Sequence, residues 1–205
     1  MRVAALVAAA GLGGRMGFPK ILLARDDGTL LLEVHLQALV AVGAAPLLVT
    51  LPPTLSTDER HAITRRVAAL GGVVTDNPHM ERGLLGSVQA VLPGLATSDF
   101  LCVLPVDTLP LEPSVLRALW DAAALYPHTF VRPRCGDATG HPLLVPRVAF
   151  SAVTGDLPGG LRTLLGQAAP LVEVDVVSQA CCQDANTPQA AGDAGWRRVT
   201  SRQLL

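Results

Sequence analysis

The chain has 205 residues, 50 % of them hydrophobic and 16 % charged, which predicts one folded domain over residues 1–205 and excludes a disordered chain. Its net charge of −1 offers no basic field for nucleic acid, and no apolar run reaches the roughly 18 residues of a membrane span, so we expect neither partner. The four cysteines form no CxxC pair, which disfavours a zinc site or a disulfide framework and fits a reducing, cytoplasmic location.

Short apolar runs alternate with amphipathic stretches along the first two thirds of the chain. The predicted strands cover residues 3–8, 47–51, 73–75 and 100–104, and the predicted helices cover 30–42, 57–70, 84–92 and 112–125. Beyond residue 126 the pattern weakens, with strand candidates at 129–132, 143–145 and 171–177 and a short helix at 161–166. This alternation predicts an α/β fold, a single-domain three-layer sandwich with a mostly parallel, Rossmann-like sheet. Ligands of such sheets bind at the carboxyl ends of the strands, so the loops there are the candidate sites.

The first apolar run has a second interpretation. Residues 1–10 also resemble a short signal peptide, because Arg2 precedes eight apolar residues. We favour a buried strand, since the small residues continue directly into a glycine loop that cleavage would destroy.

The loop after this strand carries two cations and four glycines. Glycines let backbone N–H groups approach an anion closely, and Arg15 and Lys20 bring positive charge, which is what a triphosphate requires. The Rossmann pattern GxGxxG fails at Met16, and the P-loop pattern fails because Pro19 precedes Lys20. Lys20 is also the one lysine among 16 basic residues. Because lysine is a compact point charge and arginine a broad fork, we ask what an arginine could not do there.

The pattern A-A-G-x-x-x-R-M-G-x-P-K-x-L-L over residues 9–23 resembles the signature of MobA-like nucleotidyltransferases, in particular the molybdenum cofactor cytidylyltransferase branch. The resemblance implies a fold of the nucleotide-diphospho-sugar transferase type and a loop that wraps a nucleoside triphosphate. It implies that the catalytic residues are Lys20, Arg15 and Asp107. It further implies nucleotide contacts from Ala9, Ala10, Gly11, Leu12, Gly13, Gly14, Arg15 and Lys20.

Further segments match the family in the same order along the chain. Residues 77–88 read N-P-x-x-x-x-G-L-x-x-S-V, which adds Asn77, Gly83 and Ser87 to the implied nucleotide contacts. Asp107 stands where the family has a metal-binding D-x-P loop, although the loop here is one residue longer.

The last matches imply a metal site and an acceptor site. Residues 184–188 resemble the family's D-x-D-T-P, with Asn186 in place of the second acid, so the implied Mg²⁺ ligands are Asp107, Asn186 and Asp184. A G-H-P segment at 140–142 and an approximate G-D-x-G-x-R segment at 156–162 imply acceptor contacts from His141, Asp156 and Arg162.

The implied reaction is Mg²⁺-dependent transfer of CMP from CTP to the phosphate of molybdopterin or molybdenum cofactor, with release of pyrophosphate. The A-A-G start favours CTP over GTP, and a molybdenum hydroxylase is a possible recipient of the product. The alternatives are a guanylyl- or sugar-phosphate nucleotidyltransferase, and a carrier of the cofactor with little turnover. From another class comes a nicotinamide-dependent oxidoreductase, in which Glu33 would bind the ribose.

Overall fold

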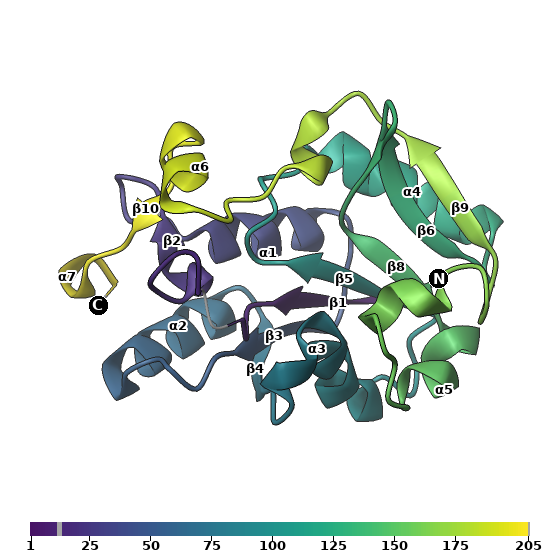
Figure 1. Ribbon diagram of the computed structural model, residues 1–205, viewed down its shortest axis with the longest axis horizontal. Coiled ribbons are helices and arrows are strands. Elements are labelled where there is room, and N and C mark those ends of the chain that lie inside the picture. The colour runs from purple at the N-terminus through teal and green to yellow at the C-terminus, as the bar shows by residue number, and fades with distance from the viewer. Residues whose placement is uncertain (12–13, 205) are drawn as a thin grey trace.

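The computed structural model describes residues 1–11 and 14–204, without the side chain of Ser201. An eight-stranded sheet forms its centre (Figure 1). The strands lie in the order β4 (Gly72–Asp76), β3 (Leu47–Leu51), β1 (Val3–Ala8), β5 (Phe100–Pro105), β8 (Leu143–Pro146), β6 (Phe130–Cys135) and β7 (Ala138–Thr139), and β9 (Leu171–Asp175) also pairs with β6. The pairs among β4, β3, β1 and β5 are parallel, as is β6 with β9, whereas β8 runs antiparallel to β5 and β6.

The central strand β1 is apolar throughout because both of its faces are covered. Val3, Ala5 and Val7 belong to one buried cluster, and Ala4 and Leu6 belong to a second cluster on the other side. This explains why residues 3–8 show no polar alternation. The strand interpretation of this segment is confirmed, and the strand lies inside the sheet, paired with β3 on one side and β5 on the other.

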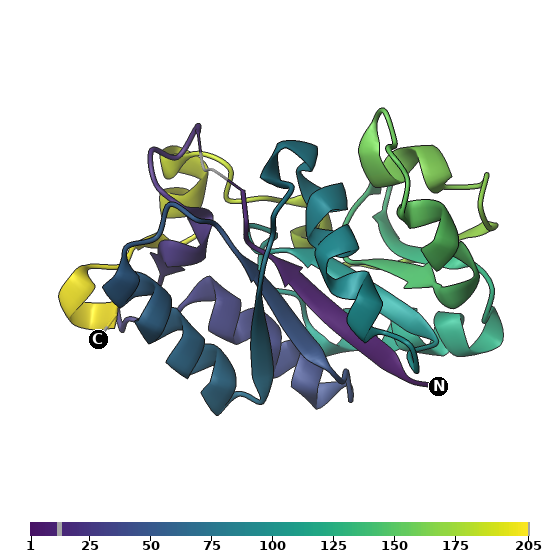
Figure 2. The same cartoon turned by 90° about the horizontal axis from the view of Figure 1, so that it is seen from below.

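Helices cover both faces of the sheet and give the three layers that the sequence predicts (Figure 2). One face packs against α1 (Leu31–Ala41), α2 (Thr57–Ala69) and α4 (Pro113–Leu125), and the other packs against α3 (Leu84–Val91) and α5 (Phe150–Val153). The four long helices start and end within two residues of their predicted bounds. The helix expected at 161–166 is a 3-10 turn, η5 (Gly160–Leu164), because glycines with positive φ stand at its start, Gly159 and Gly160, and soon after its end, Gly166.

The C-terminal segment returns to the beginning of the chain, which the sequence does not predict. Strand β10 (Arg197–Arg198) pairs with β2 (Leu23–Ala24), next to α6 (Pro188–Asp193) and α7 (Ser201–Leu204), as Figure 1 shows. Trp196 and Ala191 of this segment share a small apolar cluster with Met16 and Leu31. The segment therefore braces the loop that follows β1.

Across residues 1–11 and 14–204, every helix is too short or too polar to span a bilayer.

One polar side chain in the core, His35 of α1, faces the turn after β5. It is 1 % exposed, and its Nε2 has no hydrogen-bond partner among the described residues. Burial lowers the pKa of His35 to about 4, although the backbone of Val106 and Thr108 and the charge of Asp107 favour the protonated form. The imidazole is therefore a neutral packing group beneath this turn.

Replacing His35 with leucine is expected to flatten the pH dependence of the free energy of unfolding. His35 binds a proton near pH 6.5 in the unfolded chain but only near pH 4 in the folded chain. Its contribution to the free energy of unfolding is therefore fully present above pH 6.5 and is lost as the pH falls toward 4. The loss in the wild type should be roughly 2–3 kcal/mol, measured by urea unfolding at pH 7.5, 5.5 and 4.5. The exposed His61→Leu serves as control, and equal slopes in both variants would contradict this assignment.

Candidate active site

Two strands deliver the main polar side chains to one edge of the sheet. Strands β1 and β5 pair in parallel with Ala8 opposite Pro105, so the loops that follow them leave the sheet side by side. The first loop ends at Lys20, the first residue of a 3-10 turn whose next residues, Ile21 and Leu22, are fully buried. These apolar neighbours anchor the lysine backbone and leave its ammonium group at the end of β5.

Lys20 joins three segments of the chain. Its Nζ donates a hydrogen bond to Asp107 Oδ2 at 2.6 Å and another to Asn186 Oδ1. Asn186 Nδ2 donates to Asp184 Oδ2 at 3.2 Å. The side chains of Lys20 and Asp107 are 20 % and 12 % exposed, so this ion pair is only partly screened by water. The structure thus brings together four residues that the sequence predicts for catalysis and metal binding.

Backbone hydrogen bonds fasten the segment that carries Asp184 and Asn186 to the turn after β5. Ala185 N donates to Asp107 O at 2.7 Å, and Leu109 N donates to Gln183 O at 2.9 Å. The side chain of Thr108 adds a long hydrogen bond to Asp184 Oδ1, at 3.5 Å. Thr108 is part of the Asp-to-Pro loop that is one residue longer than in the family. Its contact with Asp184 is not predicted from the sequence.

The two carboxylates repel each other, and the ammonium group of Lys20 compensates. Partial burial raises the pKa of Asp184, and the charge of Asp107 raises it further, whereas Lys20 lowers it. Both carboxylates and the amide oxygen of Asn186 are hard oxygen donors, which suit Mg²⁺. The described residues contain no group of three or more His, Cys, Asp and Glu side chains placed to hold a metal. This donor set fits Mg²⁺, which proteins usually hold through one or two carboxylates together with substrate phosphates.

The residues of the glycine loop have different surroundings. Ala9 and Ala10 are buried, and Ala9 N already donates to Thr50 O at 3.2 Å, so this N–H is used by the sheet. Gly11, Gly14 and Arg15 are exposed to solvent. Two further predicted nucleotide contacts, Leu12 and Gly13, lie outside the described residues. The roles of these residues toward a nucleotide stay predictions.

Asn77 and Ser87 belong to a buried polar chain. Ser87 Oγ accepts hydrogen bonds from Asn77 Nδ2 at 3.2 Å and from Thr50 Oγ1 at 3.1 Å, and Asn77 Oδ1 accepts from the backbone N–H of His79 at 2.9 Å. Gly83 immediately precedes helix α3, at its N-cap position, with φ 57°. The structure therefore shows Asn77 and Ser87 fixing the shape of the 77–87 segment, and their predicted contacts with a nucleotide stay untested.

A cavity of about 530 Å³ contains two of the three predicted acceptor residues. His141 and Arg162 line it together with Arg82 and Arg132, which the sequence analysis missed, and apolar side chains that include Leu84, Leu85, Leu143, Leu161 and Leu165. Asp156 is exposed and does not line this cavity. No sequence motif marks Arg82 or Arg132. They line the same cavity only because the fold brings the turn before α3 close to strand β6.

His141 lines this cavity and is also close enough to feel the charges of Asp184 and Asp107, which with Lys20 and Asn186 form the Lys20 cluster. Burial lowers its pKa, the charges of Asp184 and Asp107 oppose this shift, and Arg162 and Arg132 reinforce it. Its backbone N–H donates to Cys181 O at 2.8 Å, and its buried Nδ1 has no hydrogen-bond partner among the described residues. A neutral imidazole with an unpaired polar nitrogen thus lies within reach of the charges of two carboxylates and two guanidinium groups.

Glu33, the acid that a nicotinamide-dependent oxidoreductase would use, has other partners. Its carboxylate accepts from Leu30 N at 2.7 Å at the start of α1 and pairs with Arg66 at 3.0 Å. Glu33 therefore stabilises a helix terminus and an ion pair, and the structure gives no support to a ribose-binding role.

Gly86 has no space for a side chain, which leads to a stability prediction. A Cβ at this position would lie 2.1 Å from His79 O and 3.1 Å from Asn77 Oδ1. Gly86→Ala should push the 77–87 segment out of place and destabilise the protein by roughly 1–3 kcal/mol in urea unfolding. Gly94→Ala is the matched control, because nothing lies within 4 Å of its Cβ. Equal free energies of unfolding for the two variants would contradict this prediction, because the 77–87 segment would then accommodate the added Cβ without loss of stability.

The chain is similar in sequence to known proteins. The model of the MobA-like NTP transferase domain matches residues 5–173. Molybdenum cofactor cytidylyltransferase of Escherichia coli K12 is 29 % identical over 147 residues, which cover 69 % of each chain.

Solved structures share the fold. The crystal structure of Rv0371c from Mycobacterium tuberculosis, a protein also solved in complex with manganese, has a TM-score of 0.74 at 23 % identity and covers 95 % of this chain and 97 % of its own. A Methanothermobacter nucleotidyl transferase has a TM-score of 0.75 at 17 % identity, with 95 % and 96 % covered. The family match spans most of the chain, the fold agrees with it, and the chain therefore belongs to the MobA-like NTP transferase family and is a nucleotidyltransferase.

Proposed function

We propose that this nucleotidyltransferase moves CMP from CTP to the phosphate of molybdopterin or molybdenum cofactor and releases pyrophosphate. The observation that carries the proposal is the cluster of Lys20, Asp107, Asp184 and Asn186 beside a cavity lined by cations and by His141. The first group suits a triphosphate with Mg²⁺, and the second suits a phosphate-bearing acceptor. The A-A-G start of the loop and the name of the Escherichia coli relative support this choice of nucleotide and acceptor.

The chemistry requires positioning and charge neutralisation more than proton transfer. An oxygen of the acceptor phosphate attacks the α-phosphorus of CTP, a new P–O bond forms, and the bond to the bridging oxygen of pyrophosphate breaks. The acceptor phosphate is already ionised at neutral pH, so no strong general base is needed. This agrees with His141, which burial keeps in its neutral form and which we assign to acceptor binding.

Lys20 has the geometry to contact a phosphate without leaving the cluster. An ammonium group has three N–H donors, and two of them point to Asp107 and Asn186. The third donor remains for an oxygen of the α-phosphate, where charge develops in the transition state. Arg15, exposed on the loop, would hold the outer phosphates with its planar fork.

Asp107, with Asp184 or Asn186, would hold Mg²⁺ when the nucleotide binds. The ion supplies neutralisation of charge on the phosphate oxygens. In this arrangement Asp107 serves two partners, since its Oδ2 also accepts from Lys20. We expect the protein in the cytoplasm, with a molybdenum hydroxylase as the recipient of its product.

The nucleotide assignment is tested by pyrophosphate release from each of the four NTPs with Mg²⁺ and molybdopterin. CTP should be the preferred donor. Lys20→Ala should reduce turnover by roughly 100- to 1000-fold, as loss of one preorganised donor does in other active sites. Release with GTP and not with CTP would exclude the proposed base.

Lys20→Arg tests why a lysine stands at this position. The guanidinium fork is wider than an ammonium group, so it should pair with Asp107 but misplace the donor toward the α-phosphate, and turnover should fall at least tenfold. The exposed Arg65→Lys on α2 is the matched control, because it makes the reverse exchange away from the site. Full activity of Lys20→Arg would show that position 20 needs charge alone.

Asn186→Asp should tighten metal binding. The change restores the family's second acid and adds a carboxylate beside Asp184 and Asp107, so half-saturation with Mg²⁺ should shift several-fold lower. Gln183→Glu, which adds the same charge at an exposed neighbour, is the control. An unchanged Mg²⁺ requirement in Asn186→Asp, measured by metal titration of turnover, would argue against position 186 as a ligand.

A further inference from the structure

Two cations of the acceptor cavity have little or no compensation from a carboxylate among the described residues. Three arginines, Arg82, Arg132 and Arg162, line the cavity, and no acidic side chain does. Arg132 donates from Nε and Nη2 to Glu173 Oε1 at 3.0 and 2.5 Å, so its charge is balanced. Arg162 forms no ion pair with a described residue. The nearest carboxylate to Arg82 is that of Glu81 at 3.9 Å, which is largely exposed.

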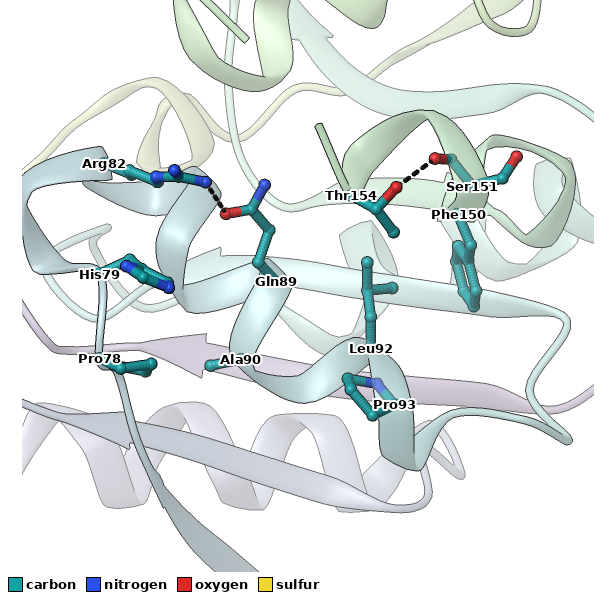
Figure 3. A pocket seen from close by; sticks show the side chains of 10 residues that line it. All are labelled: Pro78, His79, Arg82, Gln89, Ala90, Leu92, Pro93, Phe150, Ser151 and Thr154. Atoms are coloured by element: carbon teal, nitrogen blue, oxygen red, sulfur yellow. Dashed lines mark hydrogen bonds between the residues drawn. The ribbon is translucent and has the colours of Figure 1, made fainter. Parts of the chain in front are cut away.

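The guanidinium of Arg82 is held in place by a neutral partner. Its Nη1 donates to Gln89 Oε1 at 3.1 Å. The amide nitrogen of Gln89 in turn donates to Val153 O and to Gly155 O, both at 2.8 Å, so the orientation of this amide is fixed. Figure 3 shows Arg82 reaching toward Gln89 on α3, with Thr154 and Phe150 on the far side of the neighbouring groove. Gln89 therefore orients Arg82 without neutralising it.

The backbone before α3 also fixes the base of Arg82. Arg82 N donates to His79 O at 3.1 Å and Gly83 N donates to Met80 O at 2.9 Å, which closes the turn η2 (Met80–Arg82). Gly83 follows with a positive φ that starts the helix. Arg82 thus projects from a defined turn, between the groove against α5 and the acceptor cavity, both of which it lines.

We propose that Arg82 and Arg162 together bind the anionic group of the acceptor, and that Gln89 positions Arg82 for this contact. A phosphomonoester carries close to two negative charges at neutral pH. Two guanidinium groups match that charge, because Arg162 has no ion pair among the described residues and Arg82 has only a long, exposed pair with Glu81. A guanidinium group can also donate two hydrogen bonds to the oxygens of one phosphate. Arg82 comes from the nucleotide side of the cavity, at the start of α3, and Arg162 comes from η5. Arg82 is thus a specificity determinant for an acceptor with a phosphate group, an inference that rests on the proposed function for the identity of the cavity.

Binding of inorganic phosphate, followed by calorimetric titration, tests this assignment. Arg82→Gln should weaken phosphate binding roughly ten- to hundredfold, the loss of a charge-assisted hydrogen bond, and Arg82→Lys should weaken it less. Arg65→Gln, which removes an exposed charge on α2, should leave it unchanged. The same variants are measured in a Lys20→Ala background, in which phosphate binding by the glycine loop is weakened. Nucleotide binding by Arg82→Gln should remain at the wild-type level.

Gln89 is tested by a double-mutant cycle. Gln89→Leu alone should weaken phosphate binding several-fold, but in the Arg82→Gln protein the same change should have no further effect. Additive losses in the double variant would show that Gln89 acts on folding in general and would overturn its positioning role.

Three results would overturn the role of Arg82. These are unchanged phosphate affinity in Arg82→Gln, an equal loss in Arg65→Gln, and a parallel loss of nucleotide binding. If phosphate affinity is unchanged in Arg82→Gln but falls in Arg162→Gln, the role of Arg82 is overturned while the proposed function stands. Phosphate binding that depends on Arg82 in a protein that transfers no nucleotide would instead uphold Arg82 and refute the proposed function.

Discussion

The ammonium group of Lys20 is the contact on which the site depends. It joins the loop after β1, the turn after β5 and the C-terminal segment through Asp107 and Asn186. Without this cation, Asp107 and Asp184 would face each other as two carboxylates. Burial raises the pKa of Asp184, and the charge of Asp107 raises it further even with Lys20 in place. One partly buried positive charge therefore lets two acids and an amide gather at one edge of the sheet.

The remainder of the fold supports this contact from both ends of the chain. The parallel pairing of β1 with β5 brings the two loops together, and buried Ile21 and Leu22 fix the backbone after Lys20. On the other side, Arg25 lies over the ring of Trp196 at 5.0 Å and Arg198 lies over Phe18 at 5.6 Å. These cation–π contacts attach the C-terminal segment to Phe18 of the glycine loop and to Arg25 just after β2.

The sequence predicts the layers of the fold and the residues of the Lys20 cluster for two different reasons. The strands and helices before residue 126 are long and periodic, because each buries a continuous apolar face, and their bounds are confirmed within two residues. The cluster is found through segments that resemble the family's motifs in the same order along the chain, although the loop with Asp107 is one residue longer and Asn186 replaces an acid. The C-terminal elements β10, α6 and α7 are too short for periodicity to show, and they were missed.

Other parts of the site depend on contacts that no local pattern encodes. Gly86 and Arg82 stand next to recognised motif positions, yet the reason for each lies across space, in His79 O for the glycine and in Gln89 for the arginine. Asp156 illustrates the reverse case, since it matches a motif but its side chain is exposed and does not line the cavity.

The reach of the Lys20 contacts has a consequence for how the protein acquires activity. The partners of Lys20 lie 87 and 166 residues away along the chain, so the cluster exists only after loops of that size have closed. A chain whose sheet had formed but whose last twenty or so residues had not yet docked would lack Asn186 at the site. During synthesis on the ribosome the cluster cannot be assembled until residue 186 has emerged and its segment has docked against the turn after β5.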